Sequence, residues 1–154
     1  MRIAVGADGN GAAMKEAIKL HLERLGHEVT DFGVAPDADQ DYPEVAEPVA
    51  RAVAAGAVER AVLVCGTGLG MAIVANKVRG VRAAPVTDPY SAERAIRSND
   101  AHVLCLGAQV VGMSVAPLLV DHWLSGEFAG GGSARKVAQI EALDRRESDR
   151  ETAS

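Results

Sequence analysis

Short apolar runs alternate along the chain with segments in which apolar residues recur every three or four positions. The run Ile3–Ala7 has the composition of a buried strand, and apolar residues at 14, 18, 22 and 25 follow at helical spacing. Gly26 suits the position just beyond a helix end. The pattern predicts strands over 3–7, 27–32, 61–64, 80–86 and 102–106. It predicts helices over 43–55, 89–97 and 115–124, and two further helices that end at 25 and at about 77.

This succession of strand–helix units predicts an α/β fold: a three-layer α/β/α, Rossmann-like arrangement with a five-stranded parallel sheet. Pro85 is unsuited to the middle of a strand, so we expect it at an edge or a bulge. We expect one domain over 1–143, with a last helix from about 134 after a glycine-rich hinge at 130–133. The apolar stripe of that helix is a candidate for packing on another subunit, and the charged tail 144–154 is expected to fray.

Composition narrows the classes of partner. The 154 residues are 48% hydrophobic, enough for one domain to bury its own core, and the net charge of −5 argues against a nucleic-acid partner. No apolar run is long enough to span a membrane. Cys65 and Cys105 lie in apolar strands, and no zinc-binding spacing is present. We therefore expect reduced thiols, no metal and a cytoplasmic protein.

The segment after the third predicted strand combines a cysteine with three alternating glycines: Cys65-Gly66-Thr67-Gly68-Leu69-Gly70. Its spacing differs from the dinucleotide fingerprint G-x-G-x-x-G and from the P-loop. Glycines let backbone N–H groups approach an anion at a helix N-terminus, and a thiol beside such a site suits proton transfer through an enolate. A cysteine at a strand end is more commonly a core residue, so both interpretations stand on this motif alone.

The topology favours the chemical role. Ligands of parallel α/β sheets bind beyond the carboxyl ends of the strands, where the strand order switches. Asp8 follows the first predicted strand and Cys65 follows the third. We therefore expect these two side chains to lie next to each other.

Several short motifs together resemble the ribose 5-phosphate isomerase B and galactose 6-phosphate isomerase family, in family order and spacing over about residues 1–143. The matching segments are Gly6-Ala7-Asp8, Asp31-Phe32-Gly33, Asp41-Tyr42-Pro43, Cys65-Gly66-Thr67-Gly68-Leu69-Gly70, Ala75-Asn76-Lys77, Gly80-Val81-Arg82-Ala83, Tyr90-Ser91-Ala92, Asn99-Asp100 and Val110-Val111-Gly112. Some relatives use a glutamate six residues beyond the cysteine, where this chain has Met71, so the sequence resembles the cysteine type.

The resemblance implies an aldose–ketose isomerase that needs no metal or cofactor and acts as a homodimer or a dimer of dimers with shared active sites. By this resemblance Cys65 moves the proton through a cis-enediolate, the N–H groups of the 66–70 loop (Gly66, Gly68, Gly70) hold the oxyanion, and Thr67 positions the thiol or a substrate oxygen. It also implies that Asp8 binds sugar hydroxyls, that Asn99 lies near the enediolate, and that a neighbouring subunit completes the site.

The chain departs from the family at the positions that grip phosphate and open the sugar ring. Gly9 and Ser98 stand where histidines are usual, Ser98 at the ring-opening one, and Gln109, Gly132 and Lys136 stand where arginines are usual. Either a phosphate is still held by Arg135, Lys136 or a neighbour's Arg97, with water or Ser98 opening the ring, or the substrate lacks a phosphate. Since each charge-assisted hydrogen bond contributes roughly 1.5–3 kcal/mol, we expect a small sugar or sugar derivative other than ribose 5-phosphate.

Other side chains leave alternatives open. Tyr42, next to Asp41, is either a loop anchor or a stacking surface for the sugar, and both residues are candidate substrate contacts. Asp37 and Asp39 are expected to form a solvated acidic loop, and His102 is a weaker candidate for the site. A non-catalytic or partner-dependent subunit of a hetero-oligomeric isomerase, or a small-molecule binding module, is the alternative function. The presence of Asp8, Cys65, Thr67 and Asn99 favours the enzyme.

Overall fold

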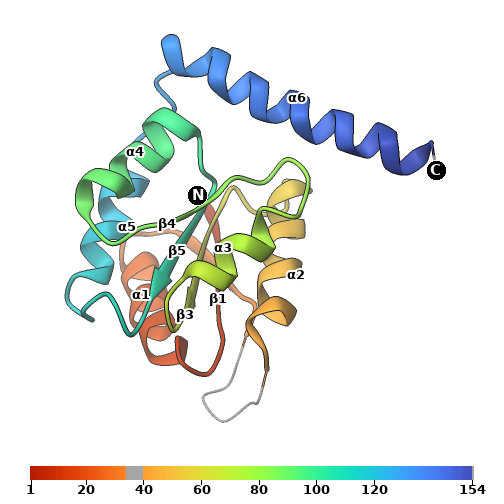
Figure 1. Ribbon diagram of the computed structural model, residues 1–154. Coiled ribbons are helices and arrows are strands. Elements are labelled where there is room, and N and C mark those ends of the chain that lie inside the picture. The colour runs from red at the N-terminus through yellow and green to blue at the C-terminus, as the bar shows by residue number, and fades with distance from the viewer. Residues whose placement is uncertain (34–39, 154) are drawn as a thin grey trace.

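Five parallel strands form one sheet in the order β2-β1-β3-β5-β4 in a computed structural model, which describes residues 1–33 and 40–153 (Figure 1). The strands are β1 (Arg2–Ala7), β2 (Glu28–Asp31), β3 (Arg60–Cys65), β4 (Ala83–Pro85) and β5 (Val103–Gly107). The helices are α1 (Ala12–Arg24), α2 (Tyr42–Ala54), α3 (Leu69–Ala75), α4 (Pro89–Asn99), α5 (Ala116–Leu124) and α6 (Gly132–Thr152). The predicted parallel α/β fold is confirmed.

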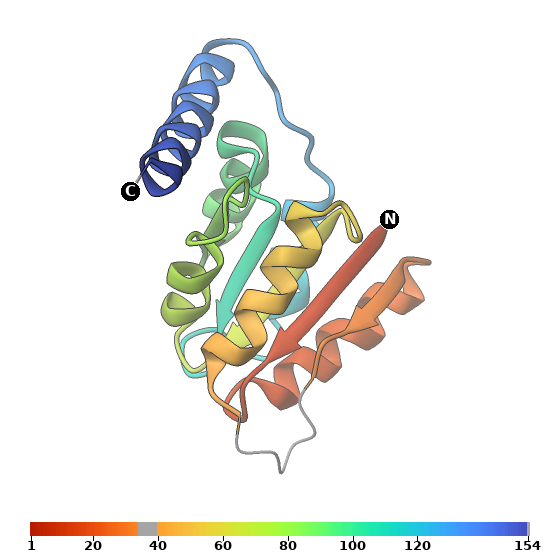
Figure 2. The same ribbon diagram turned by 90° about the vertical axis from the view of Figure 1, so that its right-hand side faces the viewer.

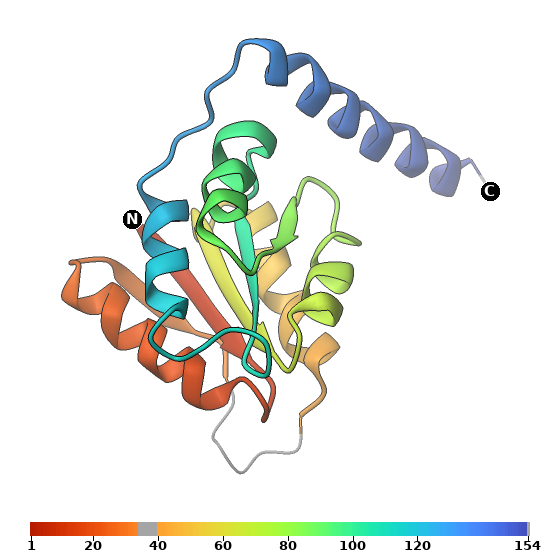
Figure 3. The same cartoon turned by 60° about the vertical axis from the view of Figure 1, so that its left-hand side comes forward.

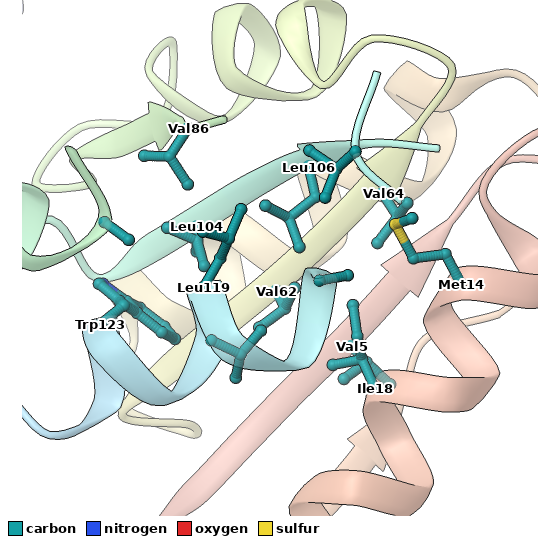
Figure 4. Close-up of a cluster of buried hydrophobic side chains, with 14 of the residues drawn as sticks. Val5, Met14, Ile18, Val62, Val64, Val86, Leu104, Leu106, Leu119 and Trp123 are labelled. Atoms are coloured by element: carbon teal, nitrogen blue, oxygen red, sulfur yellow. The ribbon is translucent and has the colours of Figure 1, made fainter. Parts of the chain in front are cut away.

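Helices cover both faces of the sheet, as the buried strands require. In Figure 2, α2 crosses in front of the strands and α1 lies behind them. One apolar cluster joins β1, β3 and β5 to α1, α4 and α5; Figure 4 shows its side chains, among them Val5, Val62 and Trp123. A second cluster on the opposite face joins the same strands to α2 and α3, and it contains both cysteines. Cys65 therefore belongs to the α2/α3 side of the sheet.

β4 is shorter than the predicted strand 80–86. It lies at the edge of the sheet and ends at Pro85, as expected for a residue that cannot donate a ladder hydrogen bond. Gly80 takes a left-handed conformation with φ of 80°. Asn76 then pairs through its side chain with both backbone groups of Ala83, at 2.9 Å each. The ladder with β5 begins at Ala83, after the turn at Gly80.

α6 extends beyond the predicted domain end at 143. The segment expected to fray is helical through Thr152, because Asp144 accepts the Gly80 N–H at 2.9 Å and Arg79 donates to Ser148 at 2.9 Å. Figures 1 and 3 show this helix projecting past the sheet. Only Val137 of its apolar residues is buried, whereas Ile140 and Leu143 remain exposed. No helix in the described part of the chain is apolar and long enough to cross a bilayer.

Candidate active site

The carboxyl ends of β1 and β3 bring the first group of functional residues together. The two strands are paired with Ala7 opposite Val64, so the next residues along each strand are Asp8 and Cys65. The Asp8 N–H donates to the Val64 carbonyl at 3.3 Å, which continues the pairing by one step. The chain segments that carry Asp8 and Cys65 therefore meet at one edge of the sheet, at the switch in strand order.

Cys65 lies at the base of a tight loop. Its side chain is buried, and the Gly68 N–H donates to its sulfur at 3.1 Å. Gly68 has φ of 79°, a left-handed conformation that lets the loop turn directly into α3. This contact fixes the position of the sulfur at the start of the loop.

Close approaches of other residues shape the loop. A Cβ atom at Gly107 would lie 2.6 Å from the Thr67 carbonyl carbon, so the end of β5 presses directly on the loop. A Cβ at Gly70 would lie 2.6 Å from the Tyr42 ring. The Thr67 hydroxyl oxygen accepts the Leu69 N–H at 3.3 Å within the turn. Loop, ring and strand end thus fix one another.

Tyr42 and Asp41 reach this edge from the start of α2. Asp41 precedes the helix, and its N–H donates to Glu44 Oε2 at 3.1 Å. This contact gives Asp41 a role in beginning α2. Tyr42 is the first helical residue, and its half-exposed ring lies over Gly70. The ring is therefore placed to form one wall of the loop.

Asp8 keeps part of its hydrogen-bonding capacity. Its Oδ1 accepts the Gly11 N–H at 3.0 Å and so closes the turn into α1. Its Oδ2 has no hydrogen-bond partner among residues 1–33 and 40–153. One carboxylate oxygen is thus available to accept from a hydroxyl group beside Cys65.

The second group of predicted residues lies at the opposite end of the sheet. Ser98 and Asn99 end α4, which leads into the amino end of β5, and Arg135 and Lys136 lie in the first turns of α6. β3 has six residues, roughly 20 Å of strand, and Cys65 is at its other end. One copy of the chain therefore does not bring Asn99, Ser98, Arg135 or Lys136 to Cys65.

The elements that carry this second group, α4 and α6, contact each other. The Ala129 N–H donates to the Arg97 carbonyl at 3.1 Å, which ties the segment before α6 to the last turn of α4. A cavity of about 370 Å³ is lined by Asn99 together with Ile140 and Leu143 of α6. We call Ser98, Asn99, Arg135 and Lys136 the amino-end group.

His102 also lies at the amino end of the sheet, so it does not reach Cys65 within one chain. Its Nε2 is 3.2 Å from Arg82 Nη2. Burial, and then the charge of Arg82, lower the pKa of His102. Cys105 is fully buried in the core, and burial raises the pKa of its thiol. Its position suits packing, as expected.

One residue at the carboxyl edge was visible in the sequence only as a departure from the family pattern. Gln109 donates its backbone N–H to the Gly66 carbonyl at 3.0 Å. Its side-chain oxygen would lie 3.0 Å from a Cβ at Gly66. The amide thus rests on the loop beside Cys65.

Asp37 and Asp39 lie outside the described residues, and within the described ones no three His, Cys, Asp or Glu side chains gather as metal ligands.

Comparisons with known proteins agree with this arrangement. The family model described as Ribose/Galactose Isomerase matches residues 3–140. The chain is 46% identical to a protein named Ribose-5-P isomerase B from Listeria innocua, over 95% of this chain and 99% of that one. It is 47% identical to a D-erythrulose-4-phosphate isomerase from Pectobacterium atrosepticum, over 91% and 93%. The structure of Clostridium thermocellum Ribose-5-Phosphate Isomerase B superposes with a TM-score of 0.93 at 42% identity, over 95% and 99% of the two chains. The chain therefore belongs to the ribose/galactose isomerase family.

Proposed function

We propose that this protein interconverts the aldose and ketose forms of an open-chain four-carbon sugar that carries an acidic group at C4, with Cys65 as the base. The family, whose named members are isomerases, supports the reaction class. The buried sulfur beside the 66–70 loop supports the choice of base. Ser98 carries the choice of substrate.

The proposed reaction moves one proton between neighbouring carbons. The Cys65 thiolate takes the proton from C2 of the aldose, and the electrons of that C–H bond form a C1–C2 double bond. The carbonyl oxygen O1 becomes the enediolate oxygen, which accepts hydrogen bonds from N–H groups of the loop. A proton passes from O2 to O1, the C2 carbonyl forms, and the thiol returns its proton to C1. Asp8 Oδ2, unpaired within the described residues, is available to hold a substrate hydroxyl.

Ser98 favours a substrate that has no ring to open. Ribose 5-phosphate has a free O4 and closes a five-membered ring, so its isomerisation needs a proton donor and acceptor for opening. A serine hydroxyl is poorly matched to that task at neutral pH. In erythrose 4-phosphate and erythrulose 4-phosphate the O4 atom is esterified and cannot close this ring. The relatives named for ribose and for erythrulose phosphates are equally similar to this chain, so identity alone does not choose between them.

We further propose that two copies of the chain complete each site. Cys65 and the amino-end group lie at opposite ends of one sheet. In the proposed dimer, a two-fold axis brings the amino-end group of one copy to the Cys65 loop of the other. Arg135 and Lys136 are both exposed, and neither forms an ion pair within the described residues. They are therefore available to bind the acidic group of a substrate held by the partner copy.

Proton NMR in D₂O tests the proposal. Erythrose 4-phosphate, ribose 5-phosphate and unphosphorylated erythrose are each incubated with the protein, and deuterium at C1 and C2 is measured. We expect fastest exchange with erythrose 4-phosphate, none above background with C65A, and retained exchange with C105A, the matched control. Ribose 5-phosphate turnover equal to or faster than that of the tetrose would overturn the substrate. Full exchange by C65A would overturn the assignment of Cys65 as the base, and no exchange with any sugar would favour the partner-dependent subunit.

The cytoplasmic location expected from the sequence stays a prediction.

A further inference from the structure

We infer that Arg82 is the positioning residue that holds the amino-end group in the geometry required by Cys65 of the partner copy. The inference rests on the proposed two-copy site. Arg82 lies immediately before β4, and its side chain is only 11% exposed. It does not itself reach the Cys65 loop, so any effect on the reaction passes through the residues that it contacts.

The first contacts of Arg82 fix the end of α4. Its Nε donates to the carbonyl oxygens of Asn99 and Asp100, each at 3.0 Å. Its Nη2 donates to Asp100 Oδ2 at 2.7 Å. Carbonyls in the last turn of a helix have no partner within the helix, and a buried guanidinium satisfies them here. The backbone that carries Asn99 is thereby held from two sides.

Asp100, which Arg82 contacts, has an unusual backbone conformation. It has φ of 50°, and it is the one non-glycine residue with positive φ in the described part of the chain. Asp adopts the left-handed region more readily than most residues when its side chain is hydrogen-bonded, and here that side chain accepts from Arg82. The ion pair with Arg82 stabilises this turn directly after Asn99. Without it, the end of α4 is free to relax.

A further contact reaches the other element of the amino-end group. Arg82 Nη1 lies 3.6 Å from Glu141 Oε1, one helical turn beyond the buried Val137 of α6. A single guanidinium thus connects the end of α4, with Ser98 and Asn99, to the helix that carries Arg135 and Lys136. Lysine cannot replace these contacts, because it lacks the planar, five-donor fork that serves several acceptors at once.

Steady-state kinetics with R82K and R82A form the first part of the test, with R79A as the matched control. Arg79 is an exposed arginine a few residues earlier that also contacts α6, through Ser148, but not the turn at Asp100. A misplacement of about 1 Å costs on the order of 10²-fold in rate. We expect kcat/KM of R82K to fall by a factor of this size. Displacement of Asn99 should lower kcat, and displacement of Arg135 and Lys136 should raise KM. R79A should stay within twofold of the wild type.

Mixed dimers separate positioning from a general effect on folding. C65A and R82K chains with different tags are co-expressed, and hybrids carrying both tags are isolated. In a hybrid, the R82K chain supplies Cys65 and the C65A chain supplies an intact amino-end group, so one site of two is restored. We expect about half of the wild-type activity. A merely structural role of Arg82 would damage the Cys65 loop of its own chain, and the hybrid would stay inactive.

Hybrids of C65A with N99A distinguish the two proposals. If these recover activity while C65A/R82K hybrids do not, the two-copy site stands and the role of Arg82 is overturned. If neither hybrid recovers, the two-copy site itself fails. Wild-type kinetics of R82K would also overturn the inference. R82K keeps the charge and most of the length of the side chain, so the test does not depend on R82A folding.

Discussion

At the residue scale, the 66–70 loop requires glycine because of the side chains that lie against it as well as because of its backbone conformation. Gly66 lies under the Gln109 amide and Gly70 under the Tyr42 ring, so a side chain at either position would displace a group that faces the loop. Gly68 needs its left-handed φ for the turn into α3. The loop is therefore sensitive to substitutions that leave the core untouched.

Gly70→Ala should affect substrate binding more than stability. The added Cβ would come within 2.6 Å of the Tyr42 ring, and because this ring is 40% exposed it can swing outward without moving the backbone. We expect KM to rise about 3- to 10-fold, equivalent to the roughly 0.5–1.5 kcal/mol of an aromatic contact. Thermal unfolding should shift little.

Gly9→Ala is the control for this prediction, because a Cβ at Gly9 meets no atom within 4 Å. Kinetics and melting curves of both variants are compared with the wild type. If G70A and G9A have the same KM, Tyr42 is only an anchor for the start of α2. If G70A melts far below G9A, the ring does not move as freely as its exposure suggests.

At the element scale, hydrophobic periodicity was sufficient to predict each strand of the sheet and each helix that covers it, but not the residues at which they begin and end. β4 is shorter than the strand expected over 80–86 because Gly80 takes a left-handed conformation and the Val81 N–H closes a turn on the Val78 carbonyl. The charged segment after 143 remained helical because contacts with Arg79 and Gly80 hold it. Such long-range polar contacts leave no periodic signal in a sequence.

The candidate site was predictable to the same extent. Asp8 and Cys65 could be placed together because adjacent parallel strands end at one edge. The location of Asn99 away from them follows from the same topology, since a helix that leads into β5 must end at the amino edge. What the sequence could not supply was the turn at Asp100 and the guanidinium that stabilises it.

The junction of α4, β4 and α6 should be sensitive to acid through His102. Burial, and then Arg82, lower its pKa, with a further lowering contribution from Arg60; Asp100 and Glu141 partly oppose them. The unfolded chain binds a proton at a pH of about 6.5, whereas the folded chain resists it to lower pH. Stability is therefore full above about pH 6.5 and falls as the pH drops from there toward the lowered pKa.

Thermal unfolding of the wild type and of H102N at pH 7.5 and pH 5.5 checks this expectation. We expect the wild type to lose more stability on acidification than H102N does. His27 has a pKa lowered by burial and by the N-terminal charge, so H27N should remove a separate part of the same loss. Equal losses in the wild type and H102N would show that the buried imidazole does not control this transition.

At the scale of the whole molecule, the net charge of −5 opposes the approach of an anionic substrate. Binding therefore depends on local cations, and Arg135 and Lys136 are exposed on a helix that only partly packs on its own chain. In the proposed two-copy site the same helix supplies charge to the partner. Association and substrate binding are then linked, because a separated chain has the thiol but not the cations.

Ser98→His tests whether the missing ring-opening group limits the range of substrates. Ser98 is partly buried beside Arg94, whose Nη1 donates to its hydroxyl at 3.4 Å, at the end of α4 that faces the partner copy in the proposed site. An imidazole there supplies a proton donor and acceptor near neutral pH, and general acid–base catalysis typically contributes about 10²–10⁴-fold. The benefit applies only to a sugar whose ring must open.

We expect the ratio of kcat/KM for ribose 5-phosphate to that for erythrose 4-phosphate to rise at least about tenfold in S98H and to stay low in S98A. An unchanged ratio in S98H, with ribose 5-phosphate bound as tightly as erythrose 4-phosphate, would mean that ring opening is not what excludes the pentose.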